Sequence, residues 1–338
     1  MQRREFITHV GGATIALAVT TAIWPLATAA QQTNRTQRVG FLLGGFADDP
    51  VEQRYIAAFR EALAKLGWID GGNLRVDLGF ATGDPGRAVA AAAELARFAP
   101  DVMVASSGFA ARASQQQTRT IPIVVVGPSP EDFGVKDIAR PEGNITGFPL
   151  LYQSIAGKWV ELLKEADPHV VRVAVVNSPD PLAAARQGYI PPIEQAAPTI
   201  GIKLVDAAFH NAADLERAVD AFASEPNGGL IAIPSAATST RENRNLIRQL
   251  AEKHRLPTIH WDDSYPAGGG LMSYGSNFTE LHRRAAAYVD RLLRGAKVSE
   301  LPIERPTKFE LVINVKAAKT IGLAIPEAFL LRADRLID

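Results

Sequence analysis

Residues 38–67 read RVGFLLGGFADDPVEQRYIAAFREALAKLG and decide the fold class. Within them, residues 39–43 form a short apolar run typical of a buried strand. Apolar residues then recur at three- and four-residue spacing, which predicts one face of a helix: Ile56, Phe59, Leu63 and Leu66. Gly67 is a typical end for that helix. A buried strand followed by an amphipathic helix begins a βαβ unit, so we expect an α/β fold with a parallel sheet.

The alternation of strands and helices occurs twice along the chain. After residues 39–43, further apolar runs are expected to be strands at 74–80, 102–105 and 123–126. A second set of runs follows at 171–176, 203–208, 230–233 and 258–261. Each run lies about 130 residues after its counterpart, and a nearly constant offset marks an internal repeat. The sequence therefore predicts two Rossmann-like lobes, each with a parallel sheet.

Three segments lie outside the repeat and are expected to be crossings between the lobes: 144–148, 270–275 and 301–311. After the second crossing, a helix is expected with Asn277 as its N-cap, Glu280 three residues later and Gly295 as its terminator. Three crossings would return this helix to the first lobe. We therefore expect the lobes to divide the chain as follows: 38–147 plus 276–304 in the first lobe, and 148–275 plus 305–338 in the second.

Residues 1–30 have the features of an export signal. Arg3-Arg4-Glu5-Phe6 precedes a mildly apolar stretch over residues 7–24, which glycine and threonine dilute. Paired arginines ahead of a weakly apolar segment are typical of a twin-arginine signal. Small residues allow cleavage near Ala29 or Ala30, so we expect a periplasmic protein. The alternative is an uncleaved anchor, but the apolar stretch falls short of the roughly 20 strongly apolar residues that span a bilayer.

Composition argues against several classes of protein. The 338 residues include 36 Lys and Arg against 36 Asp and Glu, and no Cys. A net charge of zero argues against binding to nucleic acid or to an anionic membrane surface, because both need surplus Lys and Arg. Without Cys there is no disulfide, thiolate metal site, cysteine nucleophile or acylated lipid anchor.

Small polar groups, glycines and aromatic side chains follow the predicted strands at their carboxyl ends, where open α/β sheets bind ligands. Such a set suits a small polar molecule but offers little general acid or base at neutral pH. The candidate ligand-binding residues are Gly45, Phe46, Ser106, Ser107, Phe109, Pro128, Ser129, Asn177, Ser235, Asp262 and Tyr274.

Ser106-Ser107-Gly108 is the strongest of these candidates for binding a carboxylate. It lies between a buried strand and a helix start, where hydroxyl and backbone N–H groups can replace the water around an anion. The alternative is that a serine merely caps the helix. Gly44-Gly45 fits either close ligand approach or a tight turn. Aromatic residues near these loops hint, as a group, at an aromatic or apolar ligand body: Phe46, Phe109, Trp261, Tyr265 and Tyr274.

The sequence has no P-loop, HExxH, G-x-S-x-G or complete G-x-G-x-x-G motif. Among the six histidines only His260 is a candidate metal ligand, because residues 260–263 read HWDD. Alternation along a strand would place His260 and Asp262 on one face, where they could bind a metal. Two such ligands rarely complete a site. We therefore expect no enzyme activity, no cofactor and no metal.

Four longer motifs occur at residues 140–148 (RPEGNITGF), 157–164 (GKWVELLK), 267–275 (AGGGLMSYG) and 306–314 (PTKFELVIN). Together with the export signal and the repeat, they resemble the substrate-binding proteins of ABC transporters with a type I periplasmic-binding fold. More narrowly, they resemble the subgroup that includes tryptophan- and tyrosine-type binders. The resemblance covers the whole chain, although its motifs mark crossings and scaffold more than ligand contacts.

The resemblance implies a receptor whose two lobes close on a solute and present it to the membrane permease of an ABC importer. The ligand would be amino-acid-like or a small polar or aromatic carboxylate, and we expect a monomer without a nucleic-acid partner. The chain departs from the family pattern near the expected cleft. Residues 129–134 read SPEDFG where many relatives have Asp-Pro-Val-Gly, and Ser235 stands where relatives often have an acidic residue.

Two alternative functions stay open on the sequence. A sensory receptor would pass its ligand signal to a membrane signalling protein, and neighbouring permease and ATPase genes would argue against it. An exported α/β enzyme would need a working cluster at His260 and Asp262. A sugar-responsive repressor has the same fold, but the export signal stands where a DNA-binding headpiece would be.

Overall fold

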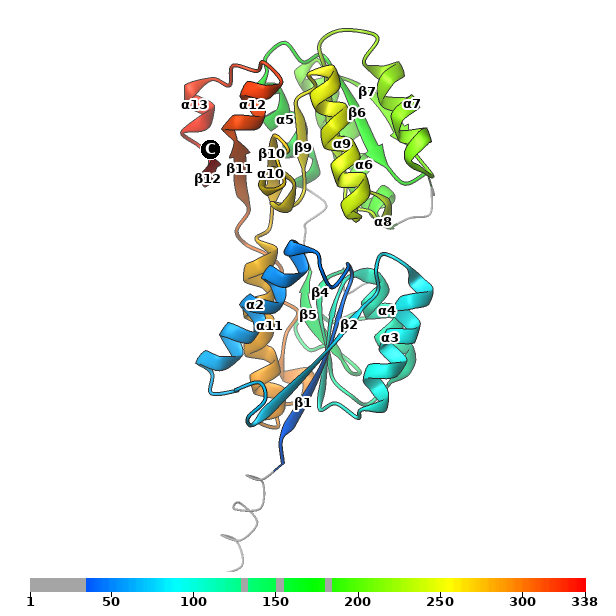
Figure 1. Ribbon diagram of the computed structural model, residues 1–338, viewed down its shortest axis with the longest axis vertical. Helices are drawn as coiled ribbons and strands as arrows, with labels where there is room; N and C mark the ends of the chain where they lie inside the picture. The colour runs from blue at the N-terminus through cyan, green and yellow to red at the C-terminus, as the bar shows by residue number, and fades with distance from the viewer. Residues whose placement is uncertain (1–34, 129–132, 150–154, 180–183) are drawn as a thin grey trace, which may run out of the picture. The chain divides into compact units, whose positions relative to one another are not determined.

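The structure is a computed structural model that describes residues 35–128, 133–149, 155–179 and 184–338. The chain divides into residues 1–36 and 37–338, and the description below concerns the second part. The described strands form two sheets (Figure 1). The first sheet contains, in spatial order, β2 (Leu74–Phe80), β1 (Gln37–Leu43), β3 (Val102–Ser106), β4 (Ile123–Gly127) and β5 (Ile145–Pro149).

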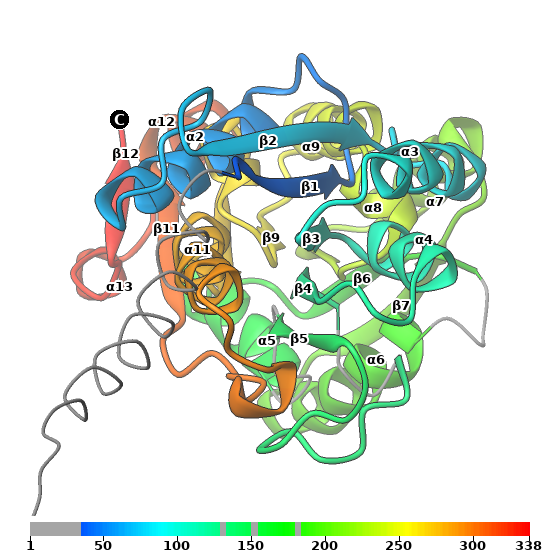
Figure 2. The same cartoon turned by 90° about the horizontal axis from the view of Figure 1, so that it is seen from below.

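Helices cover both faces of the first sheet, whose neighbouring strands are all parallel. One face packs against α2 (Pro50–Lys65) and α11 (Phe278–Leu293), and the other against α3 (Pro85–Arg97) and α4 (Gly108–Gln117) (Figure 2). Alternate residues of β1 serve the two faces: Phe41 and Leu43 join the core under α2 and α11, and Leu42 joins the core under α3 and α4. A continuous apolar strand is thus explained by burial on both faces.

The second sheet contains, in spatial order, β12 (Arg335–Ile337), β11 (Glu310–Asn314), β10 (Met272–Gly275), β9 (Thr258–His260), β8 (Gly228–Ala232), β6 (Arg172–Asn177) and β7 (Lys203–Ala208). β10 and β11 run antiparallel, and the other neighbours run parallel. In β8, Ile231 faces the core under α5 (Ala156–Ala166) and α6 (Ala184–Ala196), whereas Leu230 and Ala232 face α7 (Ala212–Phe222) and α9 (Arg241–His254). The predicted α/β class with parallel sheets is therefore confirmed.

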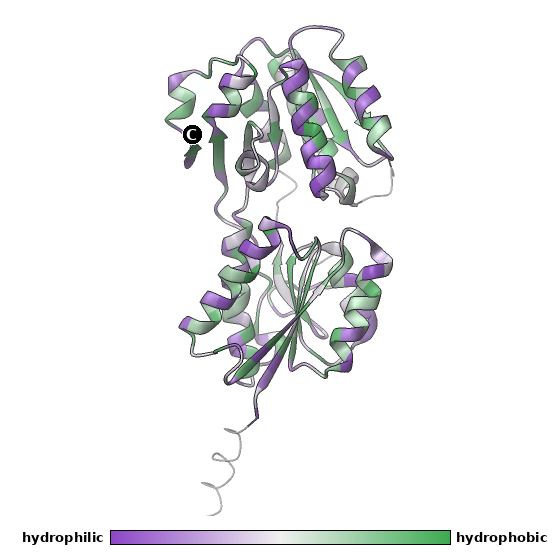
Figure 3. Ribbon diagram, viewed as in Figure 1, coloured by the Kyte–Doolittle hydropathy of each residue, from purple (hydrophilic) through white to green (hydrophobic). Residues whose placement is uncertain are grey.

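Short elements lie around the second sheet: α8 (Ala236–Ser239), α10 (Ser264–Ala267), α12 (Val315–Thr320), α13 (Glu327–Leu330) and a 3-10 turn at Ala197–Ile200. A second 3-10 turn, Val298–Glu300, lies beside the first sheet, where the next residue, Leu301, accepts a hydrogen bond from Thr146 of β5. Figure 3 shows apolar strands inside and hydrophilic residues on outward helix surfaces. Within the described part of the chain, no helix is both long and apolar enough to cross a membrane.

The predicted helix boundaries agree with local hydrogen bonds. Asp49 caps α2 by accepting from the Val51 N–H at 2.9 Å. Asn277 caps α11 by accepting from the Glu280 N–H at 2.9 Å, and Gly295 follows the helix with a φ of +97°. Side-chain acceptors at N-caps satisfy backbone donors that lack a partner within the helix. Gly67, the predicted end of α2, follows that helix with a φ of +93°. The predicted terminators of both helices and the predicted cap of α11 are therefore correct.

Two of the three segments expected to be crossings contain strands of the sheets. Residues 144–148 contribute to β5, the edge strand of the first sheet, and 270–275 contribute to β10 inside the second. The end of 301–311 begins β11, which pairs with β10. The chain passes from one sheet to the other after β5, after β10 and before β11. Apolar residues such as Phe148 and Met272 explain the difference, because each is fully buried in a sheet.

Candidate functional site

Two loops of the first lobe meet where β1 and β3 end. A side chain at Gly44 would place its Cβ 2.8 Å from the Cβ of Ser107, so only glycine allows these loops to approach so closely. At Gly45 a Cβ would lie 2.6 Å from Glu52 Oε1, and the Gly45 N–H instead donates to that oxygen at 2.7 Å. The two glycines therefore allow close packing of the loops at the sheet edge.

Ser106 directs its hydroxyl into the first lobe. His282 Nδ1 lies 2.8 Å from the Phe278 carbonyl and must donate to it, so Nε2 is left to accept from the Ser106 hydroxyl at 2.9 Å. Burial lowers the pKa of His282 to about 4, so its ring is neutral at pH 7. The Ser106 hydroxyl therefore joins β3 to α11, whereas the sequence had suggested a ligand donor.

Ser107 is the N-cap of α4. Its hydroxyl oxygen accepts from the Ala110 N–H at 3.1 Å, as the capping alternative requires. The side chain is half-buried, and its O–H proton has no assigned acceptor in the described residues. A serine can therefore cap this helix with its lone pair and still donate its proton to a ligand.

We predict different outcomes for two substitutions of Ser107. Alanine removes both the cap and the donor, so stability should fall by about 1 kcal/mol. Glycine is tolerated at N-caps at a cost of a few tenths of a kcal/mol, so Ser107→Gly isolates the donor. If the hydroxyl bonds a charged ligand group, both variants weaken binding by roughly ten- to a hundredfold.

Calorimetry and denaturant unfolding on the two Ser107 variants measure affinity and stability separately. Wild-type affinity in Ser107→Gly would show that Ser107 serves the helix alone.

The second lobe contributes polar residues at the ends of β6, β8 and β9. Asn177 is buried and donates from Nδ2 to the Val175 carbonyl at 2.8 Å and to Asp206 Oδ1 at 2.7 Å. Ser235 caps α8 in a reciprocal capping box with Thr238. Asp262 is buried beside α10, and its Oδ1 accepts from the Ser264 N–H at 2.7 Å.

The remaining candidates occupy varied surroundings. Phe46 and Pro128 are half-buried, and Phe109 packs on the core under α3 and α4. The half-buried Tyr274 lies 6.0 Å from Phe309, measured between ring centroids. Ser129 lies outside the described residues. The ligand-binding role of the whole set stays a prediction.

Charged residues of the two lobes meet beside these strand ends. Arg54 of α2 pairs with Asp263 at 3.0 Å, and Arg244 of α9 pairs with Asp49 at 3.2 Å. The Tyr55 hydroxyl donates to Asp262 Oδ2 at 3.4 Å, across the same interface. A cavity of about 320 Å³ lies alongside, with Arg54, Arg244 and Tyr265 in its lining. None of Asp49, Tyr55 and Arg244 was among the candidate site residues from the sequence.

Glu52 was also missed, although it lies in the first turn of α2 and is nine-tenths buried. The pKa of its carboxyl is raised to about 7, chiefly by burial; the Gly45 N–H and Arg244 oppose the rise, and Asp49 and Asp262 add to it. A sequence signal existed, because Glu52 precedes Ile56 by four residues and so extends the apolar stripe of α2.

His260 lies inside the second lobe, where it stacks on Tyr265 with ring centroids 5.1 Å apart. It is 1% exposed, and burial lowers its pKa to about 3. Across the described ranges, no group of three or more His, Asp or Glu residues is placed to hold a metal ion. Asp262 instead accepts a hydrogen bond from the hydroxyl of Tyr55, which belongs to the first lobe.

Comparison with known proteins now decides the family. The sequence profile of the ABC transporter substrate binding proteins matches residues 46–337. The chain belongs to this family. The resemblance seen in its motifs is thereby confirmed.

Three relatives illustrate what this substrate-binding protein is similar to. A tyrosine-binding protein of Clostridioides difficile strain R20291 is 20% identical over 295 residues, which are 87% of this chain and 84% of that protein. A conserved domain protein of Vibrio cholerae superposes with a TM-score of 0.78 and 28% identity, covering 89% of this chain and all of that one. A Streptococcus pneumoniae domain in complex with L-Trp superposes with a TM-score of 0.76 and 20% identity, over 89% and 100%.

Proposed function

We propose that this substrate-binding protein is the exported receptor of an ABC importer and captures an amino-acid-like or aromatic carboxylate solute between its two lobes. The observation that carries the proposal is the meeting of polar residues from both lobes at the strand ends, where Tyr55 bonds to Asp262. Ligands of open α/β sheets bind at such ends. The relatives named for tyrosine and L-Trp support a ligand of this class.

The capture mechanism is hinge closure of two lobes, with residues 38–147 plus 276–304 in one and 148–275 plus 305–338 in the other. Separate sheets linked by short connections favour such a motion. The loops at Gly45, Ser107 and Asp262 supply contacts from both lobes. Binding and release need no covalent step, so no catalytic residue or cofactor is assigned.

The partner is the membrane permease of an ABC transporter, which the family implies. The receptor acts as a monomer, because a clamshell completes its own site. It reaches the periplasm through a cleaved twin-arginine signal at residues 1–30, with cleavage near Ala29 or Ala30 and no lipid anchor.

The export proposal predicts that changing Arg3 and Arg4 together to Lys leaves uncleaved precursor in the cytoplasm, because the paired arginines are the recognised feature. Cell fractionation with immunoblotting measures this. Mature protein at wild-type level in the periplasm of the double variant would contradict the twin-arginine route.

A solute panel tests the proposed function. A ligand at one hundred times its dissociation constant should stabilise the protein by about 2.7 kcal/mol, because it binds the native state alone. The panel contains the twenty amino acids, aromatic carboxylic acids and simple amines, screened by thermal shift and confirmed by calorimetry. Amino-acid-like or aromatic carboxylate ligands should give the largest shifts. A panel without any binder would contradict the proposal.

A further inference from the structure

Two buried carboxylates from opposite lobes face the same region. Glu52 stands in the first turn of α2 and is 9% exposed, and Asp262 follows β9 and is 4% exposed. They lie close enough for the charge of Asp262 to affect the ionisation of Glu52. Burying two like charges together is costly unless a proton or a cation accompanies them.

Positive charges of the protein near this pair are already engaged. Arg244 pairs with Asp49 at 3.2 Å, and Arg54 pairs with Asp263 at 3.0 Å. Tyr55 offers Asp262 only a long hydrogen bond of 3.4 Å. Asp49 adds a further negative charge, so the groups facing Glu52 leave a surplus of carboxylates over guanidinium groups.

Unsatisfied polar atoms mark the same region. Glu52 Oε1 accepts the Gly45 N–H, but the buried Oε2 has no hydrogen-bond partner among the described residues. The indole Nε1 of Trp261, next to Asp262, is likewise buried without a partner in that part of the chain. Buried polar atoms are normally paired, so such orphans indicate a missing partner.

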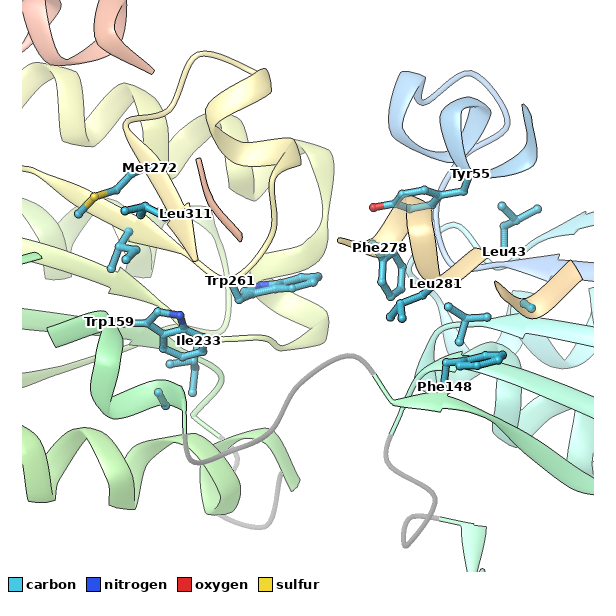
Figure 4. Packing of buried hydrophobic residues seen from close by; sticks show 14 of the residues in the cluster. Leu43, Tyr55, Phe148, Trp159, Ile233, Trp261, Met272, Phe278, Leu281 and Leu311 are labelled. Atoms are coloured by element: carbon cyan, nitrogen blue, oxygen red, sulfur yellow. The ribbon is translucent and has the colours of Figure 1, made fainter. Parts of the chain in front are cut away.

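Aromatic side chains lie on both sides of this region, and the hydroxyl of one of them, Tyr55, reaches Asp262. Figure 4 shows the Trp261 indole extending from the second lobe toward Phe278 and Tyr55 of the first. Tyr55 and Phe278 contact each other edge to face, with ring centroids 4.9 Å apart. Aromatic faces beside carboxylates suit a cation attached to an aromatic or apolar body.

We propose that Glu52 and Asp262 bind the protonated amine of the solute, which makes a primary ammonium group a requirement for ligand binding. This inference rests on the proposed function and narrows its ligands to those with an ammonium group, such as aromatic amino acids. The ammonium donates to Glu52 Oε2 and to Asp262 Oδ2. It also supplies the positive charge that lets the two lobes bring their carboxylates together.

The site makes binding depend on pH. Without ligand, the pKa of Glu52 is about 7, so at pH 6 most of its carboxyl groups are protonated. An ammonium ligand must then displace that proton. The dissociation constant should therefore be about tenfold higher at pH 6 than at pH 8. A solute that instead accepts a hydrogen bond from the protonated Glu52 would bind more weakly as the pH rises.

Matched ligand pairs test the requirement by isothermal titration calorimetry. L-Tyrosine is compared with 3-(4-hydroxyphenyl)propionate, and L-tryptophan with indole-3-propionate; each pair differs only in the amine. The wild-type protein should bind the amino acid at least tenfold more tightly, since the lost contact joins charged groups. Glu52→Gln should weaken amino-acid binding by roughly ten- to a hundredfold, leave the deaminated analogue almost unchanged and flatten the pH dependence.

Controls keep these outcomes distinct. Glu61→Gln, on the exposed side of the same helix, should change neither ligand's affinity. Glutamine retains the acceptor for the Gly45 N–H; if Glu52→Gln nevertheless fails to fold, Asp262→Asn replaces it in the same titrations.

Equal binding of amino acid and analogue, or equal losses for both in Glu52→Gln, would overturn the amine requirement. Binding of the deaminated acids alone would overturn it while leaving the solute receptor intact. No binding by any panel compound would refute both proposals.

Discussion

Between pH 7 and pH 4.5, each of two buried histidines, His260 and His282, is expected to reduce the free energy of unfolding by about 2 kcal/mol. Burial lowers their pKa values to about 3 and about 4. Below pH 6.5 the two histidines bind protons in the unfolded chain, whereas in the native state their rings stay neutral. The stability that the neutral histidines contribute is therefore fully present above pH 6.5. It is lost as the pH falls toward their native-state pKa values.

Denaturant unfolding at pH 7, 5.5 and 4.5 measures this effect, with His282→Gln as the test variant. Glu52 acts in the opposite direction, because its raised pKa makes the native state bind a proton first. Only the difference between wild type and variant is therefore informative. The loss of stability with acid should be about 2 kcal/mol smaller in His282→Gln. The same slope in wild type and His282→Gln would contradict the assignment.

Gly147→Ala is expected to destabilise the protein by at least about 3 kcal/mol or to prevent folding. Gly147 pairs with Val125 across β4 and β5 and has a φ of +144°. An added Cβ would lie 2.0 Å from the Val125 carbonyl oxygen and 2.7 Å from its nitrogen. Backbone atoms of a buried strand cannot move aside as a flexible side chain can.

Gly143→Ala separates steric overlap from backbone conformation. Gly143 also has a left-handed φ, of +80°, but nothing lies within 4 Å of its Cβ position. This control should lose about 1 to 2 kcal/mol, the conformational cost alone. Chemical unfolding of both variants gives the comparison. Equal losses would show that the packing of β5 on β4 is looser than the structure indicates.

The sequence predicted regular elements well where local signals agreed. The apolar stripe from Ile56 to Leu63 correctly predicted α2, and the cap at Asn277 correctly predicted α11. Both signals are local, because helix faces and caps depend on nearby residues. The pairing of β10 with β11 was missed. Their register joins Met272 to Ile313, and nothing local in either segment specifies so distant a partner.

The candidate site was predictable only in part. Strand ends and small polar residues located the region, and the capping alternative for Ser107 follows from its position. The direction of the Ser106 hydroxyl was not predictable, because its partner His282 is 176 residues away in sequence. Glu52 was predictable as a site residue, because an acidic side chain on the apolar stripe of a helix is expected to be buried. Buried carboxylates are rare unless they have a partner, so such a residue indicates a functional site.

Small-angle X-ray scattering of the purified protein, with and without a saturating panel ligand, tests the central claim most directly. A receptor that captures its solute by closing two lobes should show a smaller radius of gyration when L-tyrosine, L-tryptophan or another confirmed binder is present. The change should follow the same saturation curve as calorimetric binding. Full occupancy with an unchanged radius of gyration would contradict the account.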